Sequence, residues 1–456
     1  MTNKNLNNFL INKDRSIKEA MRIIDRNGSG IALVIDKKKK LFGIVTDGDI
    51  RGAILKGINI NKKVEEITNR NPITIKNKGS LTHEIGKKVR EKIATGGSLK
   101  IPVVNKKGVI EDIIFVYIDK GRVFQTAENK LKTDKGGVKS VLVTGGAGYL
   151  GSILCRKLLN RGYRVRVLDN LTYGDEGVRD LYKNKNFELL KGDVRNISEV
   201  VGALRGADAV IHLAAIVGDP AGQLDPKRTI EINYLSTNAI ANACKYNQIN
   251  KFLFTSTCSV YGVSETPDDR LREDSSLNPV SLYAETKLKS EEGIFSLADE
   301  NFSPTIFRFG TLYGISPRMR FDLVINTLTA RALVKKQFSI FGGQQWRPNL
   351  EVSDAAEACL LWLNSPIKKV EGEVFNVGAN EQNCKIIEIG QTIKKIIPEA
   401  KMEIEKEKGD QRNYNVSFDK ISRVLGFKAK KTIKDGIREM IKFKDIKNFD
   451  KPKYSN

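Results

Sequence analysis

The stretch VLVTGGAGYLGSILCRKLLNRGYRVRVLDN, residues 141–170, decides the fold class of this chain. It opens with an apolar run, passes through Gly145, Gly148 and Gly151, and continues with the apolar spacing of a helix. A second apolar run ends at Asp169, at the interval expected for the next parallel strand of a βαβ unit. The sequence therefore predicts a strand, a tight glycine turn, a helix and a second strand.

Glycines in such a turn let the backbone approach a pyrophosphate, whose charge can rest on the amide groups at the helix N-terminus. Asp169 would accept hydrogen bonds from an adenosine ribose and would repel a 2′-phosphate at the same place. The pattern therefore predicts a dinucleotide site that takes NAD rather than NADP. The alternative, a glycine turn that binds nothing, is disfavoured because the motif lies between a strand and a helix.

Composition and charge limit the kinds of function that remain. A chain of 456 residues predicts two or three domains, and its two histidines are too few for a histidine-based metal site or catalytic triad, so we expect no metal. The five scattered cysteines indicate reduced thiols. A polar N-terminus and apolar runs too short to span a membrane predict a cytoplasmic protein that binds no membrane. The net charge of +23 is spread along the chain, which favours a solvated basic surface over a nucleic-acid site.

Residues 1–125 precede the nucleotide fold and form a repeated pattern of helix, strand and strand. The first copy predicts a helix from Ser16 to Arg26, strands at residues 31–36 and 41–46, and a helix from Asp49 to Leu55. The weaker second copy predicts a helix from Leu81 to Ile93 and strands in IPVV and IIFVYI, residues 101–104 and 113–118.

This repeat resembles a tandem CBS domain, most clearly in the segment GIVTDGDIRGAILKG. In that family a Thr-x-x-Asp element binds an adenine nucleotide such as AMP or ATP, and Thr46 and Asp49 match it. The aligned residues of the second copy, Phe115 and Ile118, do not match, so at most one nucleotide site is expected. A structural or dimerising module that binds nothing is the alternative.

Residues 119–140 are polar, charged and without periodicity, which predicts a linker. Within this segment we set the boundaries of the linker between the two domains at residues 126–138. From residue 139 to 456 buried strands alternate with helices. One predicted strand ends at Asp193-Val194, and the next is AVIHLAA, residues 209–215. A helix is predicted from Glu231 to Asn247, and the segment KFLFTST after it is predicted to be a strand. This alternation predicts an α/β domain with a doubly wound parallel sheet, in which ligands bind beyond the carboxyl ends of the strands.

Two segments beyond the glycine turn carry the reacting groups. Thr257 lies in a hydroxyl-rich strand end, and Tyr283 and Lys287 project from one face of a helix at i and i+4. A lysine ammonium beside a phenol, together with a positive nicotinamide ring, lowers the pKa of the phenol toward neutrality. Tyr283 could then act as a general base on a hydroxyl that Thr257 holds in line. Alone, the Tyr-x-x-x-Lys spacing is common in surface helices, so its position in this fold carries the argument.

At these motifs the chain from residue 139 to about 442 resembles an extended short-chain dehydrogenase/reductase of the NAD-dependent epimerase/dehydratase family. TGGAGYLG, LDN, GDV, HLAA, STCSVYG, YAETK, RFGTLYG and FNVG occur in that family's order. The resemblance implies a Rossmann domain with a C-terminal nucleotide-sugar region, and a nucleotide-diphosphate sugar as substrate. It gives Thr257, Tyr283 and Lys287 the catalytic positions, and it implies that Thr257, Arg347 and Arg412 contact the substrate. The cofactor positions that it implies are Gly145, Gly148, Tyr149, Leu150, Gly151, Asp169, Asn170, Asp193, Val194, Ala214, Asn233, Tyr283 and Lys287.

The chain departs from this family at two places. The 4,6-dehydratases of the family carry an Asp-Glu pair after the catalytic threonine, where this chain has Cys258 and Ser259, so dehydration is disfavoured. A packed thiol is favoured over a nucleophile for Cys258 because no histidine lies near it in the sequence. The loop VGDPAG, residues 217–222, differs from the usual galactose epimerase sequence and leaves the sugar open.

The sequence thus predicts an NAD-dependent nucleotide-sugar epimerase that acts through a transient keto sugar, with C4 as the expected carbon. The expected sugar is a hexose like that of UDP-glucose or UDP-galactose. An adenine nucleotide at the CBS module would tune the enzyme, and the family favours a homodimer. The alternatives are a nucleotide-sugar ketoreductase or dehydrogenase, a 4,6-dehydratase, and a catalytically inactive regulatory protein.

Overall fold

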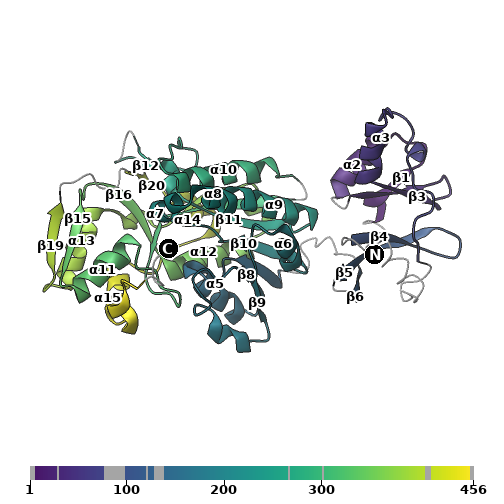
Figure 1. Ribbon diagram of the computed structural model, residues 1–456. Coiled ribbons are helices and arrows are strands. Elements are labelled where there is room, and N and C mark those ends of the chain that lie inside the picture. Colours follow the sequence, from purple (N-terminus) through teal and green to yellow (C-terminus); the bar gives the residue numbers. More distant parts are fainter. Residues whose placement is uncertain are drawn as a thin grey trace. The chain divides into compact units, whose positions relative to one another are not determined.

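A computed structural model of the chain describes residues 6–27, 30–75, 98–119, 122–127, 138–264, 268–299, 302–405 and 412–451 (Figure 1). The chain divides into two compact units, the first made of Met1–Gly137 with Tyr246–Gln248 and the second of Val138–Lys245 with Ile249–Asn456. The helix predicted from Leu81 to Ile93 and most of the predicted linker lie outside the described residues.

The first unit contains a small sheet covered by two helices. The sheet has the order β1-β2-β3. Its strands are β1 (Leu10–Asn12), β2 (Ile31–Ile35) and β3 (Leu41–Thr46), and its helices are α2 (Ile17–Asn27) and α3 (Asp47–Leu55). Ile17, Ala20 and Ile24 recur at helical spacing along α2 and are buried in one core cluster with residues of β2. The predicted elements of the first copy are therefore present within two residues of their expected ends.

Thr46 and Asp49 form a reciprocal cap at the start of α3. The Thr46 hydroxyl accepts a hydrogen bond from the Asp49 amide at 3.3 Å, and the Asp49 carboxylate accepts one from the Thr46 amide at 2.8 Å. A third bond, 2.7 Å long, runs from the Thr46 hydroxyl to the Asp49 carboxylate. These bonds satisfy backbone donors that a helix N-terminus leaves without partners. The Thr-x-x-Asp motif therefore has a structural role in this unit.

A second sheet of the first unit has the order β4-β5-β6, with antiparallel pairing. Its strands are β4 (Ser98–Val104), β5 (Ile110–Asp119) and β6 (Arg122–Ala127). The prediction of a linker from Asp119 onward is therefore wrong for residues 122–127. RVFQTA contains Val123, Phe124 and Thr126, which have high β propensity, and pairing with β5 outweighs the polar character of the segment.

The second unit is built on a seven-stranded sheet in which every pairing is parallel, in the order β9-β8-β7-β10-β11-β13-β17. Its strands are β7 (Ser140–Thr144), β8 (Arg164–Asp169), β9 (Phe187–Lys191), β10 (Ala209–His212), β11 (Lys251–Thr257), β13 (Ser303–Phe309) and β17 (Val374–Val377). The sheet confirms the predicted α/β fold with a doubly wound parallel arrangement.

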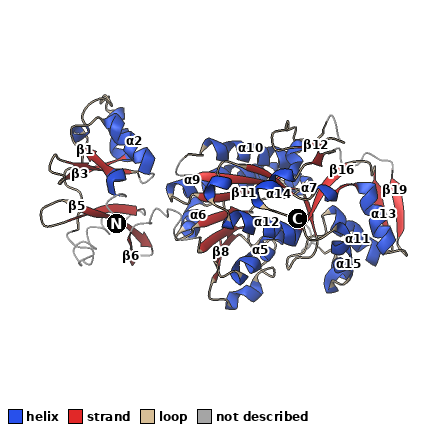
Figure 2. Ribbon diagram, turned by 180° about the vertical axis from the view of Figure 1, so that it is seen from behind, coloured by secondary structure: helices blue, strands red, loops and turns tan. Residues whose placement is uncertain are grey.

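Helices cover both faces of this sheet (Figure 2). Val141 and Val143 of β7 belong to the core cluster that also contains residues of the helices α5 and α12, whereas Leu142 belongs to the cluster with residues of α6, α9 and α10. This alternation follows from the two-residue period of a strand. The helices are α5 (Tyr149–Asn160), α6 (Ile197–Leu204), α9 (Ser236–Tyr246), α10 (Leu282–Ser296) and α12 (Val352–Asn364).

The sheet reverses its direction of winding between β7 and β10, which are neighbours in space but not in sequence. In sheets of this kind the loops diverge at that point and open a crevice at the carboxyl ends of the strands. Two short helices, α7 (Asp219–Leu224) and α8 (Pro226–Ile230), follow β10 and precede a π-helical turn at Glu231–Leu235. The site therefore lies where the glycine turn after β7 meets the loop after β10.

The C-terminal part adds smaller sheets and helices beside this edge (Figure 1). The sheets are β14-β16-β18, β15-β19 and β12-β20. Their strands are β12 (Arg270–Leu271), β14 (Thr311–Tyr313), β15 (Gln337–Phe341), β16 (Trp346–Glu351), β18 (Asn383–Lys385), β19 (Lys401–Glu405) and β20 (Asn415–Val416). The helices are α11 (Val324–Val334), α13 (Ile386–Ile396), α14 (Asp419–Leu425) and α15 (Ile433–Ile441).

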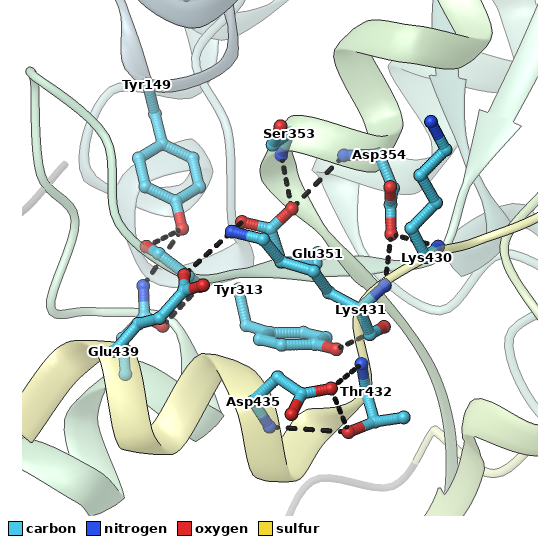
Figure 3. A network of polar contacts seen from close by, with 12 residues as sticks. Tyr149, Tyr313, Glu351, Ser353, Asp354, Lys430, Lys431, Thr432, Asp435 and Glu439 are labelled. Carbon is cyan, nitrogen blue, oxygen red and sulfur yellow. Dashed lines mark hydrogen bonds and ion pairs between the residues drawn. The ribbon is translucent and has the colours of Figure 1, made fainter.

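A polar network joins α15 to the start of α12 (Figure 3). The buried carboxylate of Glu351 caps α12 by accepting bonds from the amides of Ser353 and Asp354, at 2.8 and 3.2 Å. Lys431 lies 3.6 Å from Glu351 and 2.7 Å from Glu439 of α15. The Asp354 carboxylate accepts bonds from the amides of two residues that precede α15. These contacts fix the C-terminal helix against the nucleotide fold.

Candidate active site

A cavity of about 840 Å³ opens at the carboxyl ends of the central strands and extends toward α11 and β15. Its walls come from the glycine turn, the loop after β10, α10 and the C-terminal part. Most of the predicted site residues line it: Gly145, Gly148, Tyr149, Leu150, Gly151, Asp169, Asn170, Val194, Ala214, Tyr283, Lys287, Arg347 and Arg412. The predicted residues Asp193, Asn233 and Thr257 are not among the lining residues, and Thr46 and Asp49 belong to the first unit.

The glycine turn leaves no room for side chains at two positions. Gly145 has φ +71°, and a Cβ atom there would lie 2.7 Å from the Ala214 amide nitrogen. A Cβ atom on Gly151 would lie 2.5 Å from the Gly145 carbonyl oxygen. Glycine is therefore required for the turn and for close packing of α5, whose N-terminus follows Gly148 and lines the cavity. This geometry fits a pyrophosphate held by helix N-terminal amides.

Asp169 ends β8 at the cavity wall, as predicted. Its carboxylate accepts hydrogen bonds from the amides of Ala147 and Leu171, at 3.0 and 2.9 Å, which fix its orientation. Burial raises the pKa of Asp169, while those two bonds lower it. Asp193 instead forms an ion pair with Arg195 at 2.9 Å, which lowers the pKa of Asp193 to about 2. Of the two carboxylates, only that of Asp169 faces the cofactor region of the cavity.

Asn233 holds the loop after β10 in place. Its side-chain oxygen accepts a bond from the Ile216 amide at 2.8 Å, and its side-chain nitrogen donates one to the Ile216 carbonyl at 2.9 Å. Tyr149 has a comparable role on the other side, because its hydroxyl donates to the Gly314 carbonyl at 2.6 Å. Both residues therefore hold backbone segments that border the cofactor region, and their predicted contact with the cofactor stays a prediction.

Thr257, Tyr283 and Lys287 come together at the end of β11. Tyr283 and Lys287 lie in the first two turns of α10, which Ser281 caps, and both are buried. The Thr257 hydroxyl lies near enough to the Tyr283 phenol to lower the pKa of that phenol. The Lys287 ammonium donates to the Thr255 carbonyl at 2.8 Å and lies 4.7 Å from the centre of the Phe254 ring. The structure thus assembles the three predicted residues at one place.

The predicted lowering of the Tyr283 pKa is not provided by the side chains. Burial raises the pKa of Tyr283 to about 12, and the Thr257 hydroxyl and the positive charge of Arg320 offset only part of this. Burial also lowers the pKa of Lys287 to about 7, so its charge is itself costly in this place. The effect of burial on the pKa of Tyr283 therefore outweighs the effect of the lysine charge. Lowering that pKa toward neutrality needs the positive charge of an oxidised nicotinamide as well.

The two residues after Thr257 differ in their surroundings. Cys258 is buried, its thiol donates to the Arg308 carbonyl at 3.2 Å, and burial raises its pKa, so it is a packed thiol as predicted. Ser259 lines the cavity, and its hydroxyl lies 3.2 Å from the Tyr414 hydroxyl. Neither position offers a carboxyl group for removing water.

The two predicted substrate arginines lie close together at the C-terminal side of the cavity. Arg347 is buried and donates to the Trp346 carbonyl at 2.7 Å and to the Arg412 carbonyl. Arg412 forms an ion pair with Asp219 at 3.0 Å and lies 3.4 Å from the Ser259 hydroxyl. Arg412 therefore lies beside Asp219 and Ser259 in the cavity, and its contact with the substrate stays a prediction.

Sequence reasoning missed two buried arginines that line the cavity, Arg318 and Arg320. The Arg318 guanidinium lies over the Tyr173 ring at 4.2 Å, and its charge lowers the pKa of Asp169. Arg320 pairs with Asp322. The segment SPRMRFD follows RFGTLYG after one residue, Ile315, so its position after a strand end was a signal, but the family motifs quoted end at Gly314.

Among the residues that the structure describes, no group of three or more His, Cys, Asp or Glu side chains could hold a metal ion. His212 is buried between the hydroxyls of Thr144 and Thr237, at 2.6 and 2.9 Å, and burial lowers its pKa to about 3. Within the described ranges, every helix is too short or too polar to cross a membrane.

Comparison with known proteins identifies relatives of this site and fold. The model of the CBS domain matches residues 4–56, the first of the two predicted copies. UDP-glucuronic acid decarboxylase 4 of Arabidopsis thaliana is 31% identical over 319 residues, which cover 67% of this chain and 68% of that protein. UDP-glucose 4-epimerase of Bacillus subtilis is 28% identical over 329 residues, which cover 66% of this chain and 94% of that protein.

A solved structure, UDP-glucuronic acid 4-epimerase from Bacillus cereus in complex with UDP-glucuronic acid and NAD, has a TM-score of 0.61 and 28% identity, over 68% of this chain and 99% of that chain. The model of the NAD dependent epimerase/dehydratase family matches residues 141–378. That match includes the glycine turn, Asp169 and the Thr257, Tyr283 and Lys287 group. The chain therefore belongs to the NAD dependent epimerase/dehydratase family, with NAD as its cofactor.

Proposed function

We propose that this protein is a nucleotide-sugar epimerase that inverts C4 of a hexose through a transient keto sugar. One observation carries the proposal: Tyr283, Thr257 and Lys287 meet beside the glycine turn, and no carboxyl group stands at positions 258 and 259. A base for the sugar hydroxyl is thus in place, whereas the acid and base for eliminating water are not. The UDP-glucose 4-epimerase of Bacillus subtilis and the UDP-glucuronic acid 4-epimerase of Bacillus cereus support this choice within the family.

Each residue has a defined task in this reaction. Tyr283 takes the proton from the C4 hydroxyl and later returns it, and Thr257 donates a hydrogen bond that holds the same oxygen in line. Lys287, fixed by the Thr255 carbonyl, supplies positive charge that stabilises the tyrosinate. The hydride chemistry, removal from C4 and return to the opposite face of the rotated keto sugar, belongs to bound NAD.

The test is a product analysis with the purified full-length protein. Small molecules released from it are identified by mass spectrometry, and the protein is then incubated with UDP-, GDP-, CDP- and dTDP-sugars. We expect released NAD and a product isomeric with one substrate, without added cofactor. Conversion that occurs only with added NAD or NADH, in an amount equal to the substrate, would replace the proposal with a net oxidoreductase. Loss of carbon dioxide from a uronate would replace it with a decarboxylase, the activity named for the Arabidopsis relative.

We further propose that an adenine nucleotide at Thr46 and Asp49 tunes the enzyme, and that the protein is a homodimer. The CBS match at residues 4–56 supports the first proposal. Calorimetry of the full chain with AMP and ATP tests it: heat of binding that is lost in Asp49→Asn is expected, and the absence of heat in the parent chain would contradict it. Sedimentation of the purified protein tests the dimer, and a monomer at micromolar concentration would contradict it.

A further inference from the structure

Asp219 connects three segments that meet at the sugar end of the cavity. Gly218, at φ +100°, turns the chain after β10, and Asp219 begins α7 directly behind it. The Asp219 carboxylate accepts a hydrogen bond from the Ser281 hydroxyl at 2.6 Å and pairs with the Arg412 guanidinium at 3.0 Å. The loop after β10, the catalytic helix α10 and the C-terminal part are therefore joined at one carboxylate.

This carboxylate shares the cavity with Tyr283, the proposed base, and acts on its electrostatics. Ser281 caps α10 only two residues before Tyr283, and the negative charge of Asp219 is one of the influences that raise the pKa of Tyr283. Asp219 lines the same cavity as Tyr283, and its side chain remains 21% exposed even though it is paired. An accessible acceptor therefore stands where the hydroxyl groups of the sugar would lie in the proposed reaction.

Three of the cations that line the cavity, Arg412, Arg320 and Lys287, already contact acceptors of the chain. Arg412 pairs with Asp219, and Arg320 pairs with Asp322, whose carboxylate also accepts from the Arg320 Nε atom at 3.0 Å. Lys287 donates to the Thr255 carbonyl. A carboxylate on the sugar would compete with Asp219 for Arg412 and would bring two negative charges together in a site of low dielectric.

We propose that Asp219 selects the substrate class: a nucleotide-diphosphate hexose whose sugar is uncharged, with its hydroxyl groups donating to the Asp219 carboxylate, in preference to a uronate. This rests on the proposed epimerase function and narrows it. The relatives of known name include enzymes for UDP-glucose and for UDP-glucuronic acid, so family membership leaves this choice open. The loop VGDPAG, in which Asp219 lies, is where the chain departs from the galactose epimerase pattern.

The test compares pairs of substrates that differ only at C6, with the NAD-bound enzyme. UDP-glucose is compared with UDP-glucuronate, UDP-galactose with UDP-galacturonate, and GDP-mannose with GDP-mannuronate, by chromatography of the isomers. We expect kcat/KM to favour the neutral sugar by about tenfold or more, since apposed like charges are strongly unfavourable. In Asp219→Asn, which keeps an acceptor for Ser281 and frees the Arg412 charge, we expect that preference to fall by about tenfold. Asp219→Ser serves as a second variant if the first is unstable.

Asp180→Asn provides the matched control, because Asp180 is a surface carboxylate, 63% exposed, that pairs with Arg156. It should leave the preference unchanged. A wild-type enzyme that isomerises the uronate as fast as its neutral partner would overturn the inference, and so would a preference that persists in Asp219→Asn. Failure of the proposed function looks different: no isomer then forms from either member of any pair, and the inference falls with it.

Discussion

The Lys287 Nζ atom donates a hydrogen bond to the Thr255 carbonyl oxygen, 2.8 Å away. This bond holds the ammonium group in the buried interior beside the Phe254 ring, where burial lowers the pKa of Lys287 to about 7. A carbonyl dipole and an aromatic face stabilise the cation less than water does. The protein therefore holds a buried charge that the proposed reaction uses and that costs stability.

The cost of this charge predicts a pH-dependent stability. The unfolded chain binds the Lys287 proton up to about pH 10.5, the folded chain only up to about pH 7, so stability rises with pH between these values. Below pH 7 the full cost is present. We therefore expect the free energy of unfolding of Lys287→Met, relative to that of the wild type, to rise by about 1.4 kcal/mol for each pH unit as the pH falls from 9.5 to 7. Thermal unfolding measures it. Lys289 is exposed on the same helix, and Lys289→Met should differ from the wild type in free energy of unfolding by an amount that does not change with pH. The same pH-independent difference for Lys287→Met would contradict the prediction.

Tyr283→Phe should abolish turnover while leaving the cofactor in place. The loss of the only proposed proton acceptor predicts a fall in kcat of about 10²–10⁴-fold. The phenyl ring keeps the packing of α10, so released NAD should match the wild-type amount by mass spectrometry. Tyr182→Phe is the control, because Tyr182 is exposed and donates to Asp175 at 2.8 Å on the surface. Full activity of the Tyr283 variant would remove this residue from the chemistry.

Asp169→Ser should relax the choice between NAD and NADP. The carboxylate is oriented by the amides of Ala147 and Leu171 toward the region where the ribose is expected. Its removal takes away a charged acceptor for the ribose and the repulsion of a 2′-phosphate, so we expect the preference for NAD to fall by about tenfold or more. Titration of the apoprotein with both cofactors measures it. Asp175→Asn, in a surface pair with Arg179, should keep the wild-type preference.

Glu351→Ala should destabilise the second unit by about 2 kcal/mol. The substitution removes two capping bonds at the start of α12 and the partner of Lys431 that lies 3.6 Å away (Figure 3). Chemical denaturation, followed by near-ultraviolet circular dichroism, measures the change. Glu357→Ala on the same helix removes ion pairs with Arg161 and Lys157 near the surface and should cost less than about 1 kcal/mol. Equal losses in the two variants would show that the network contributes nothing beyond surface charge.

The sequence predicted best those parts of the fold that depend on neighbouring residues in the chain. The glycine turn was predictable because Gly145 and Gly151 occupy positions that exclude a Cβ atom, and the order of motifs then placed the sheet. Strand β6 was not predicted, because pairing with β5 is a tertiary effect that a polar segment does not reveal.

At the site, the sequence motifs predicted which residues come together but not the electrostatics of those residues. Tyr283 and Lys287 were found by their spacing, whereas the direction of the Tyr283 pKa depends on burial, which one helix pattern cannot give. Arg318 and Arg320 were missed because nothing local marks an arginine as cavity-lining rather than exposed. The pairing of Asp219 with Arg412 joins residues far apart in sequence, so only the fold reveals it.

The cap formed by Thr46 and Asp49 bears on how such modules can change over time. Helix α3 needs both side chains at its start, whether or not a nucleotide binds. A lineage that lost the ligand would still be under selection to keep the pair, because a substitution there would weaken the fold first. A chain can therefore contain this motif because the motif caps a helix, because it binds a nucleotide, or for both reasons. Only a direct measurement of binding separates these cases.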